Sequence, residues 1–93
     1  MTATLSLTDR PQLRCGVRTG TDPLTGAAVL LFPEGVLILS ETAAAVIRQC
    51  DGSRSVAEVV RALGEMYDDV LGEDVMSLLR DLLMQHLLVA SRG

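Results

Sequence analysis

Two cysteines and one histidine are the residues of this chain best suited to metal binding or nucleophilic catalysis. Cys15, Cys50 and His86 are far apart in the sequence, without a CxxC or paired-histidine spacing. A closed zinc site needs four ligands, so this spacing argues against a metal site. A Cys–His pair would also need an orienting group, and no local motif supplies one. We therefore expect the cysteines to pack in the core, and we predict no metal ligand and no catalytic residue.

The acidic and glycine residues are also better explained by structure than by catalysis. Asp68-Asp69 and Glu73-Asp74 precede an apolar periodic segment, where negative charge stabilises a helix N-terminus. The glycines are scattered and do not form a phosphate-binding loop. His86 is near the end of the last predicted helix, where either a cation or a left-handed residue is favourable. The chain is thus predicted not to be an enzyme and to need no cofactor.

Length and composition indicate one small domain with an aliphatic core. The chain has 93 residues, of which 48% are hydrophobic, but only one is Phe and one is Tyr. No apolar run approaches the roughly 20 residues that span a bilayer, and the N-terminus lacks the features of a signal peptide. Two cysteines without a secretory signal fit a reducing compartment. We expect a cytoplasmic protein with a flexible arm over residues 1–11 and a single domain over residues 12–93.

The charge distribution argues against nucleic acid as a partner. The formal net charge is −4, and all basic residues are Arg. The segment from Ser40 onward has five Arg against nine acidic residues, so it carries the whole negative excess. Affinity for nucleic acid comes mainly from cations that neutralise phosphates, so this acidic half is poorly suited to it.

Two adjacent apolar runs dominate the first half of the chain. Ala27 to Phe32 and Val36 to Leu39 are joined by Pro33-Glu34-Gly35, a turn short enough to make them antiparallel strands. A strand with one wet face normally alternates apolar and polar residues. Neither run alternates, so something other than solvent is expected on their second face.

The preceding residues predict a third strand. Leu13, Cys15 and Val17 alternate with Arg14, Gly16 and Arg18, which indicates a strand with one wet face. Thr19 to Gly26 is rich in turn formers and is expected to be a loop. In a simple meander, this strand and the strand over Val36 to Leu39 would form the two edges.

Three helices are predicted after the strands. Ser40 is a good N-cap for a helix that closes at Asp51-Gly52. Ser55 and Glu58 match a capping box at the start of a second helix. A wide leucine-rich stripe predicts a third helix, and Leu87 to Val89 form a last apolar segment. The order predicts an α+β fold, specifically a winged helix-turn-helix with a three-stranded antiparallel sheet followed by three helices.

The apolar edge of the strand over Val36 to Leu39 is the feature most indicative of function. Exposed sheet edges are usually covered, so the protein's own helices or a second copy of the chain could lie there. Alternatively, a guest peptide could pair its backbone with this edge and place side chains in an apolar groove. We favour peptide capture by strand addition.

The segment LLFPEGVLILSETAAAVIRQCDGSRSVAEVV resembles the PqqD family, the peptide chaperones of pyrroloquinoline quinone (PQQ) biosynthesis. The resemblance rests on the apolar-Pro-Glu turn, the strand ending at Ser40, the Ala-rich helix, Cys50-Asp51-Gly52 and the capped Val-rich helix. It extends over residues 10–89, since RPQLRCGVR is similar to the family's first strand and DVMSLLRDLLMQHLLV to its last helix. One departure is His86, where the family often has Gly.

The resemblance implies a precursor-peptide recognition element. Such a domain would bind a PqqA-like precursor peptide and present it to a PqqE-like radical S-adenosylmethionine enzyme, which cross-links a Glu and a Tyr. The guest would lie along the third strand and against the third helix. The residues then expected to bind the peptide are Val36, Leu37, Ile38, Leu39, Val75, Leu79, Leu82 and Leu83.

Two other functions remain open from the sequence. A DNA-binding winged helix is disfavoured by Glu73, Asp74 and Asp81 on the helix that would read DNA. A self-associating structural module would instead cover the apolar edge by forming a homodimer.

Overall fold

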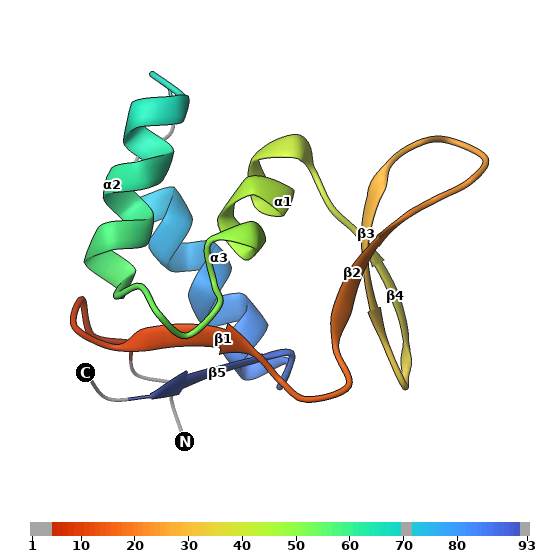
Figure 1. Ribbon diagram of the computed structural model, residues 1–93, viewed down its shortest axis with the longest axis horizontal. Coiled ribbons are helices and arrows are strands. Elements are labelled where there is room, and N and C mark those ends of the chain that lie inside the picture. Colours follow the sequence, from red (N-terminus) through yellow and green to blue (C-terminus); the bar gives the residue numbers. More distant parts are fainter. Residues whose placement is uncertain (1–4, 70–71, 92–93) are drawn as a thin grey trace.

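A computed structural model describes residues 5–69 and 72–91, and Figure 1 shows its arrangement. Within these residues, four strands precede three helices, and a fifth strand follows them. Their bounds are β1 (Arg10–Leu13), β2 (Arg18–Thr21), β3 (Ala28–Phe32), β4 (Gly35–Ile38), α1 (Glu41–Arg48), α2 (Val56–Met66), α3 (Gly72–Met84) and β5 (Leu88–Ser91).

The strands form two separate antiparallel sheets. One sheet has the order β2-β3-β4, and the other pairs β1 with β5. In Figure 1 the three-stranded sheet lies on one side of α1, while α2, α3 and the β1-β5 pair lie on the other. The predicted α+β class and the three helices are confirmed. The expected count of three strands is wrong for the described residues, which contain five.

The strand predicted over Leu13 to Val17 is in fact a turn between two strands. Leu13 ends β1, and the amide of Val17 donates to the carbonyl of Arg14 over 2.9 Å. Gly16 has a φ of 90°, a conformation that an L-residue rarely adopts. The glycine therefore reverses the chain at the centre of the alternating pattern, and β1 and β2 belong to different sheets.

The loop predicted over Thr19 to Gly26 is shorter than expected. Thr19 to Thr21 pair with β3, so only the residues after them form the connection. The amide of Asp22 donates to the carbonyl of Ala27, and the amide of Gly26 donates to the carbonyl of Asp22, both over 2.8 Å. The β-branched threonines pair readily in a strand, so turn composition alone was misleading there.

Both predicted helix caps are confirmed. The Ser40 hydroxyl accepts from the amide of Ala43 over 3.1 Å at the start of α1. At the start of α2 the Ser55 amide donates to Glu58 Oε1 over 2.9 Å, and the Glu58 amide donates to Ser55 Oγ over 3.2 Å. This capping box satisfies two amides that the helix itself cannot pair.

The N-terminal segment is tied to the start of α2. The carbonyl of Asp9 accepts from the amide of Val56 over 2.8 Å, and the carbonyl of Leu7 accepts from the amide of Ala57 over 3.0 Å. Arg10 and Pro11, which the sequence assigned to a flexible arm, lie in β1, and the Pro11 side chain is fully buried. The strand forms because β5 supplies a pairing partner from the far end of the chain, which local composition cannot reveal. The arm's first four residues lie outside the described residues.

The end of α3 adopts the left-handed turn that was one of the two expectations for His86. His86 has a φ of 60°, and its amide donates to the carbonyl of Leu83 over 3.1 Å. The amide of Leu87 donates to the carbonyl of Leu82 over 3.0 Å. This C-cap turns the chain toward β5. Leu88 and Val89 of the predicted apolar segment lie in that strand, and Leu87 lies in the turn before it.

The core is aliphatic and collects side chains from the three helices and from the strands. Its fully buried members include Leu30, Val46, Val56, Val59, Leu63, Leu79, Leu82 and Leu88. Cys50 is buried among them and its thiol donates to the carbonyl of Val46 over 3.2 Å, as a packing cysteine would. Cys15 is exposed, so the expectation that both cysteines are buried is wrong for that residue.

Ser55→Ala is expected to lower the free energy of unfolding by about 1 kcal/mol, because it removes the hydroxyl of the capping box. Ser77→Ala is a matched control, since Ser77 is exposed within α3 and lacks a capping role. Urea denaturation followed by circular dichroism measures both. Equal midpoints for the two variants would contradict the assigned role of Ser55.

The pKa of the Cys50 thiol is raised to about 12. Burial is the larger cause, and the negative charge of Asp51 is the smaller one. An unfolded cysteine titrates near 8.5, so above that pH the unfolded chain releases a proton that the folded chain retains. Stability from this group is therefore complete below about pH 8.5 and falls as the pH rises toward 12. We expect the free energy of unfolding to decrease less steeply in Cys50→Ala than in the unmodified protein over pH 8.5–10.5. Parallel pH profiles would show that this thiol does not contribute.

Candidate functional site

Strand β4 is an edge strand of the three-stranded sheet. It pairs with β3 on one side, and no described strand pairs with its other side. In Figure 1 it lies at the outer margin of the sheet, away from α2 and α3. The edge predicted from the sequence at Val36 to Leu39 is thus present, with the strand itself over Gly35–Ile38.

The hydrogen-bond pattern determines which backbone groups of β4 face outward. The amide of Leu39 donates to the carbonyl of Ala28 over 2.9 Å, and Leu37 lies opposite Leu30 in the same register. In an antiparallel pair, residues that bond to the neighbouring strand alternate with residues that do not. Gly35 and Leu37 therefore direct their N–H and C=O groups toward β3. Val36 and Ile38 direct theirs toward the open edge.

Val36 and Ile38 also expose their side chains. They are 60% and 70% exposed, respectively. The register places Val36 opposite Leu31 and Ile38 opposite Val29, so these four side chains share one face of the sheet. We call this the outer face. A cleft of about 400 Å³ lies on it, lined by Thr21, Asp22, Pro23, Val29, Leu31, Val36 and Ile38.

Leu37 and Leu39 lie on the opposite face and differ from their neighbours in exposure. Leu37 is partly buried and packs against the core, and Leu39 is 7% exposed. The prediction that β4 is apolar on both faces is confirmed. Of its four candidate site residues, Val36 and Ile38 are therefore open to a guest, while Leu37 and Leu39 mainly support the sheet.

The four candidate residues of α3 serve chiefly to hold the helix in place. Val75, Leu79 and Leu82 are 2%, 0% and 1% exposed, so their side chains are already buried in the core. Leu83 is partly buried at its margin. Three of these residues thus offer no accessible surface to a guest in this conformation, because they pack against other helices and strands.

A second cleft brings the β3–β4 turn next to the end of α3. It has a volume of about 380 Å³ and is lined by Arg14, Phe32, Glu34, Gln85, His86 and Leu87. Arg14 Nη2 lies 3.2 Å from Glu34 Oε1, while the amide of Arg14 donates to the carbonyl of Leu87 over 3.0 Å. Sequence reasoning missed Phe32 and Gln85 as lining residues, because only the three-dimensional fold brings these distant segments together.

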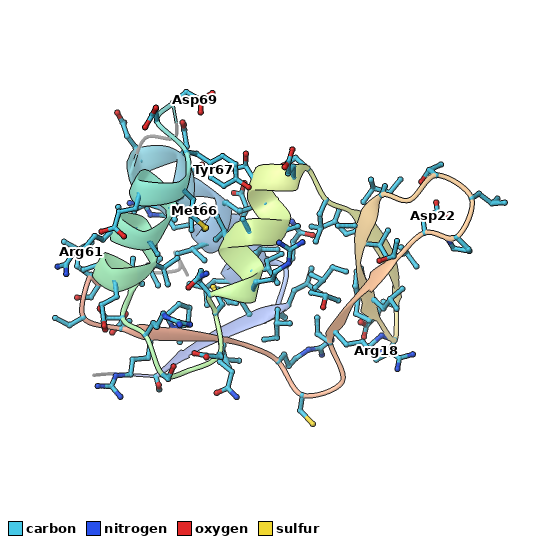
Figure 2. All side chains as sticks on the ribbon, turned by 45° about the horizontal axis from the view of Figure 1, so that its top comes forward. Arg18, Asp22, Arg61, Met66, Tyr67 and Asp69 are labelled. Atoms are coloured by element: carbon cyan, nitrogen blue, oxygen red, sulfur yellow. The ribbon has the colours of Figure 1, made fainter. Side chains whose placement is uncertain are left out.

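The charged side chains around the sheet lie at the rim of the outer face. Arg18, in β2, lies opposite Leu31 of β3, and Asp22 lines the outer-face cleft. Figure 2 shows both on the sheet side of the molecule, remote from Asp69 beyond the end of α2. The apolar centre of the outer face is therefore bordered by charge on its β2 side.

The two carboxyl groups with lowered pKa values stabilise local structure, one in a turn and one in a helix cap. The hydroxyl and amide of Ser53 hold the pKa of Asp51 below its usual value, and Ser55 does the same for Glu58 through the capping box. Within residues 5–69 and 72–91, no cluster of three or more His, Cys, Asp or Glu side chains could hold a metal ion. No helix in that part of the chain is long and apolar enough to span a membrane.

Comparison with known proteins identifies relatives over most of the chain. The family model described as "Coenzyme PQQ synthesis protein D (PqqD)" matches residues 27–88. A protein of Azotobacter vinelandii named "PqqA binding protein" is 45% identical over 76 residues, which cover 80% of this chain and 83% of the relative. A Rhodopseudomonas palustris protein of the same name is 35% identical over 91 residues, covering 95% and 89% of the two chains.

A solved structure supports the same relationship. The solution NMR structure of the PqqD truncation of Methylobacterium extorquens PqqCD is similar, with a TM-score of 0.72 and 30% sequence identity. The match covers 92% of this chain and 95% of the other. That protein is described as a functional, stand-alone recognition element for ribosomally synthesized and post-translationally modified peptides (RiPPs). By sequence and by fold, the chain belongs to the PqqD family.

Proposed function

We propose that this protein binds the precursor peptide of PQQ biosynthesis by adding it as a strand to the open edge of β4. The observation that carries this proposal is the outward direction of the N–H and C=O groups of Val36 and Ile38. An extended peptide can satisfy these groups with its own backbone. Several relatives are named for binding PqqA, which supports a peptide as the guest.

The magnitudes are consistent with binding at micromolar concentrations. Two residues with outward N–H and C=O groups provide four backbone hydrogen bonds, each worth about 1 kcal/mol net. Burial of about 300 Å² of apolar surface at about 25 cal/mol per Å² adds about 7.5 kcal/mol. Ordering a flexible guest costs about 3 kcal/mol. The balance, about −8.5 kcal/mol, corresponds to a Kd slightly below 1 μM.

The guest would be presented to a radical S-adenosylmethionine enzyme of the PqqE type. In this proposal the protein supplies no catalytic group; it holds the precursor extended so that the enzyme can reach its Glu and Tyr. The proposed recognition domain is the single domain predicted from residue 12 onward, extended to include Arg10 and Pro11 because they belong to β1. In this proposal α2 and α3, together with the three-stranded sheet, would form the winged helix-turn-helix. Because the precursor peptide is synthesised by ribosomes, the protein would bind it in the cytoplasm.

The distribution of acidic residues does not favour DNA as the guest. Glu73, Asp74 and Asp81 are all exposed on α3, the helix that a winged-helix protein of that kind would insert into the major groove. Their carboxylates would face the phosphates of the duplex, and the resulting repulsion opposes binding.

Ile38→Pro is expected to weaken binding of Azotobacter vinelandii PqqA about fivefold or more. Proline removes the outward N–H of Ile38, worth about 1 kcal/mol, and leaves the bonds to β3 in place. Thr19→Pro is a matched control, because the register also directs the Thr19 N–H away from β3, but at the opposite edge of the sheet, and Thr19 does not line the outer-face cleft. Isothermal titration calorimetry measures both affinities, and circular dichroism checks both folds. A folded Ile38→Pro variant with unchanged affinity would rule out strand addition at this edge.

Presentation to the enzyme is tested separately from binding. We expect a PqqE-type enzyme to form the Glu–Tyr cross-link in PqqA faster when this protein is present. Ile38→Pro should remove most of that acceleration at peptide concentrations below saturation, and Thr19→Pro should retain it. Mass spectrometry of the peptide follows the cross-link. If the cross-linking rate is the same with and without this protein, although the peptide is bound, binding does not serve presentation to this enzyme.

A further inference from the structure

Two residues of β4 each provide two kinds of contact. Val36 and Ile38 direct their backbone N–H and C=O groups to the open edge, and they also expose apolar side chains on the outer face. A guest strand that bonds to these groups places its own paired residues directly opposite them. In an antiparallel or parallel sheet, neighbouring residues at the same level share a face. The guest residues next to Val36 and Ile38 would therefore project onto the outer face.

The outer face is a packed surface, distinct from the main core. Val29 is only 5% exposed, yet it lies outside the cluster of core side chains that the helices cover. Leu31 lies so close over Gly20 that a Cβ atom added to this glycine would be 3.0 Å from Leu31 Cδ1. These contacts give the cleft of about 400 Å³ a defined apolar floor beside β4.

The residues predicted on the helix side of the edge are mostly covered. Val75, Leu79 and Leu82 are buried in the core, and Leu37 is partly covered. Val36 and Ile38, in contrast, are more than half exposed on the outer face. A guest next to β4 can therefore bury apolar surface on the side away from α3.

We infer that the outer face is a second recognition surface for the precursor peptide and selects aliphatic side chains at alternate positions of the bound strand. This inference rests on the proposed strand addition, and Val36 and Ile38 are the residues that would determine the preference. The guest is the expected occupant because the cleft is continuous with the β4 edge.

A second copy of the chain is a weaker candidate for the same surface. The four aliphatic side chains of the outer face could bury on the order of 400 Å² at most. Stable protein–protein interfaces bury about 800 Å² per partner, so this patch is about half of what a dimer needs. A bound peptide does not need as large an interface, because the backbone hydrogen bonds of the edge contribute to its affinity.

Val36→Thr and Ile38→Thr test the inference while keeping β-branched residues and all backbone groups. We expect each to weaken binding of Azotobacter vinelandii PqqA about three- to tenfold, because a polar group replaces apolar surface against the guest. Val89→Thr is the matched control, since Val89 is 48% exposed on β5, in the other sheet. Calorimetry measures affinity, and thermal unfolding checks stability.

A serine scan of the PqqA peptide supplies an independent readout. Against the unmodified protein, we expect the sensitive peptide positions to include a set spaced by two residues. For that set only, the effect of a serine should shrink when the protein carries Val36→Thr or Ile38→Thr, since the same contact is then already lost. Additive effects at every peptide position would overturn the inference.

The outcomes separate this inference from the proposed function. If the threonine variants bind PqqA within twofold of the unmodified protein while Ile38→Pro weakens it, strand addition stands and outer-face recognition is wrong. If Ile38→Pro is also without effect, the proposed strand addition itself fails. Sedimentation velocity over a range of concentrations detects a dimer; a dimer that dissociates in the threonine variants without loss of peptide affinity would assign the outer face to self-association instead.

Discussion

The register between β3 and β4 is the constraint on which the candidate site depends. Leu30 is completely buried at the centre of β3, and Leu37 lies opposite it on the same face. A slip of one residue would turn Leu30 toward solvent and direct its neighbours into the core, so burial strongly favours one register. Once that register is set, the alternation of the antiparallel ladder leaves Val36 and Ile38 with outward backbone groups. Burial of a core leucine thus determines which peptide groups are available to a guest.

The rest of the fold supports this hairpin from a distance. β1 pairs with β5, and the segment just before β1 accepts hydrogen bonds from the amides of Val56 and Ala57 at the start of α2. The left-handed His86 ends α3 and directs the chain into β5. Arg14 links the end of α3 to the β3–β4 turn, since its amide donates to the carbonyl of Leu87 and its guanidinium contacts Glu34. The edge strand is therefore attached to the helical part through the β3–β4 turn as well as through the core.

Local sequence signals were sufficient to predict the helices and the β3–β4 hairpin. The other strands were harder to predict, because they form through pairing between distant segments of the chain. Ser40, Ser55 and Glu58 revealed helix starts because capping is decided by residues within one turn. The alternating pattern around Cys15 was misleading because Gly16 adopts a positive φ, and β1 forms only through its distant partner β5. The site was predicted in part: the sequence identified the apolar edge of β4, but it could not show that Val75, Leu79 and Leu82 are already used by the core.

An exposed apolar strand edge favours aggregation, and the surroundings of β4 reduce this tendency. Such edges pair readily with other chains and promote aggregation, so proteins usually shorten them or flank them with charge and proline. β4 has only four residues, and the turn before it contains Pro33 and Glu34, with Glu34 held by Arg14. These features restrict pairing to a short segment and leave its two residues with outward backbone groups, Val36 and Ile38, uncharged and open. A charge at either position would protect the edge further, so the apolar character of Val36 and Ile38 agrees with the proposed strand addition.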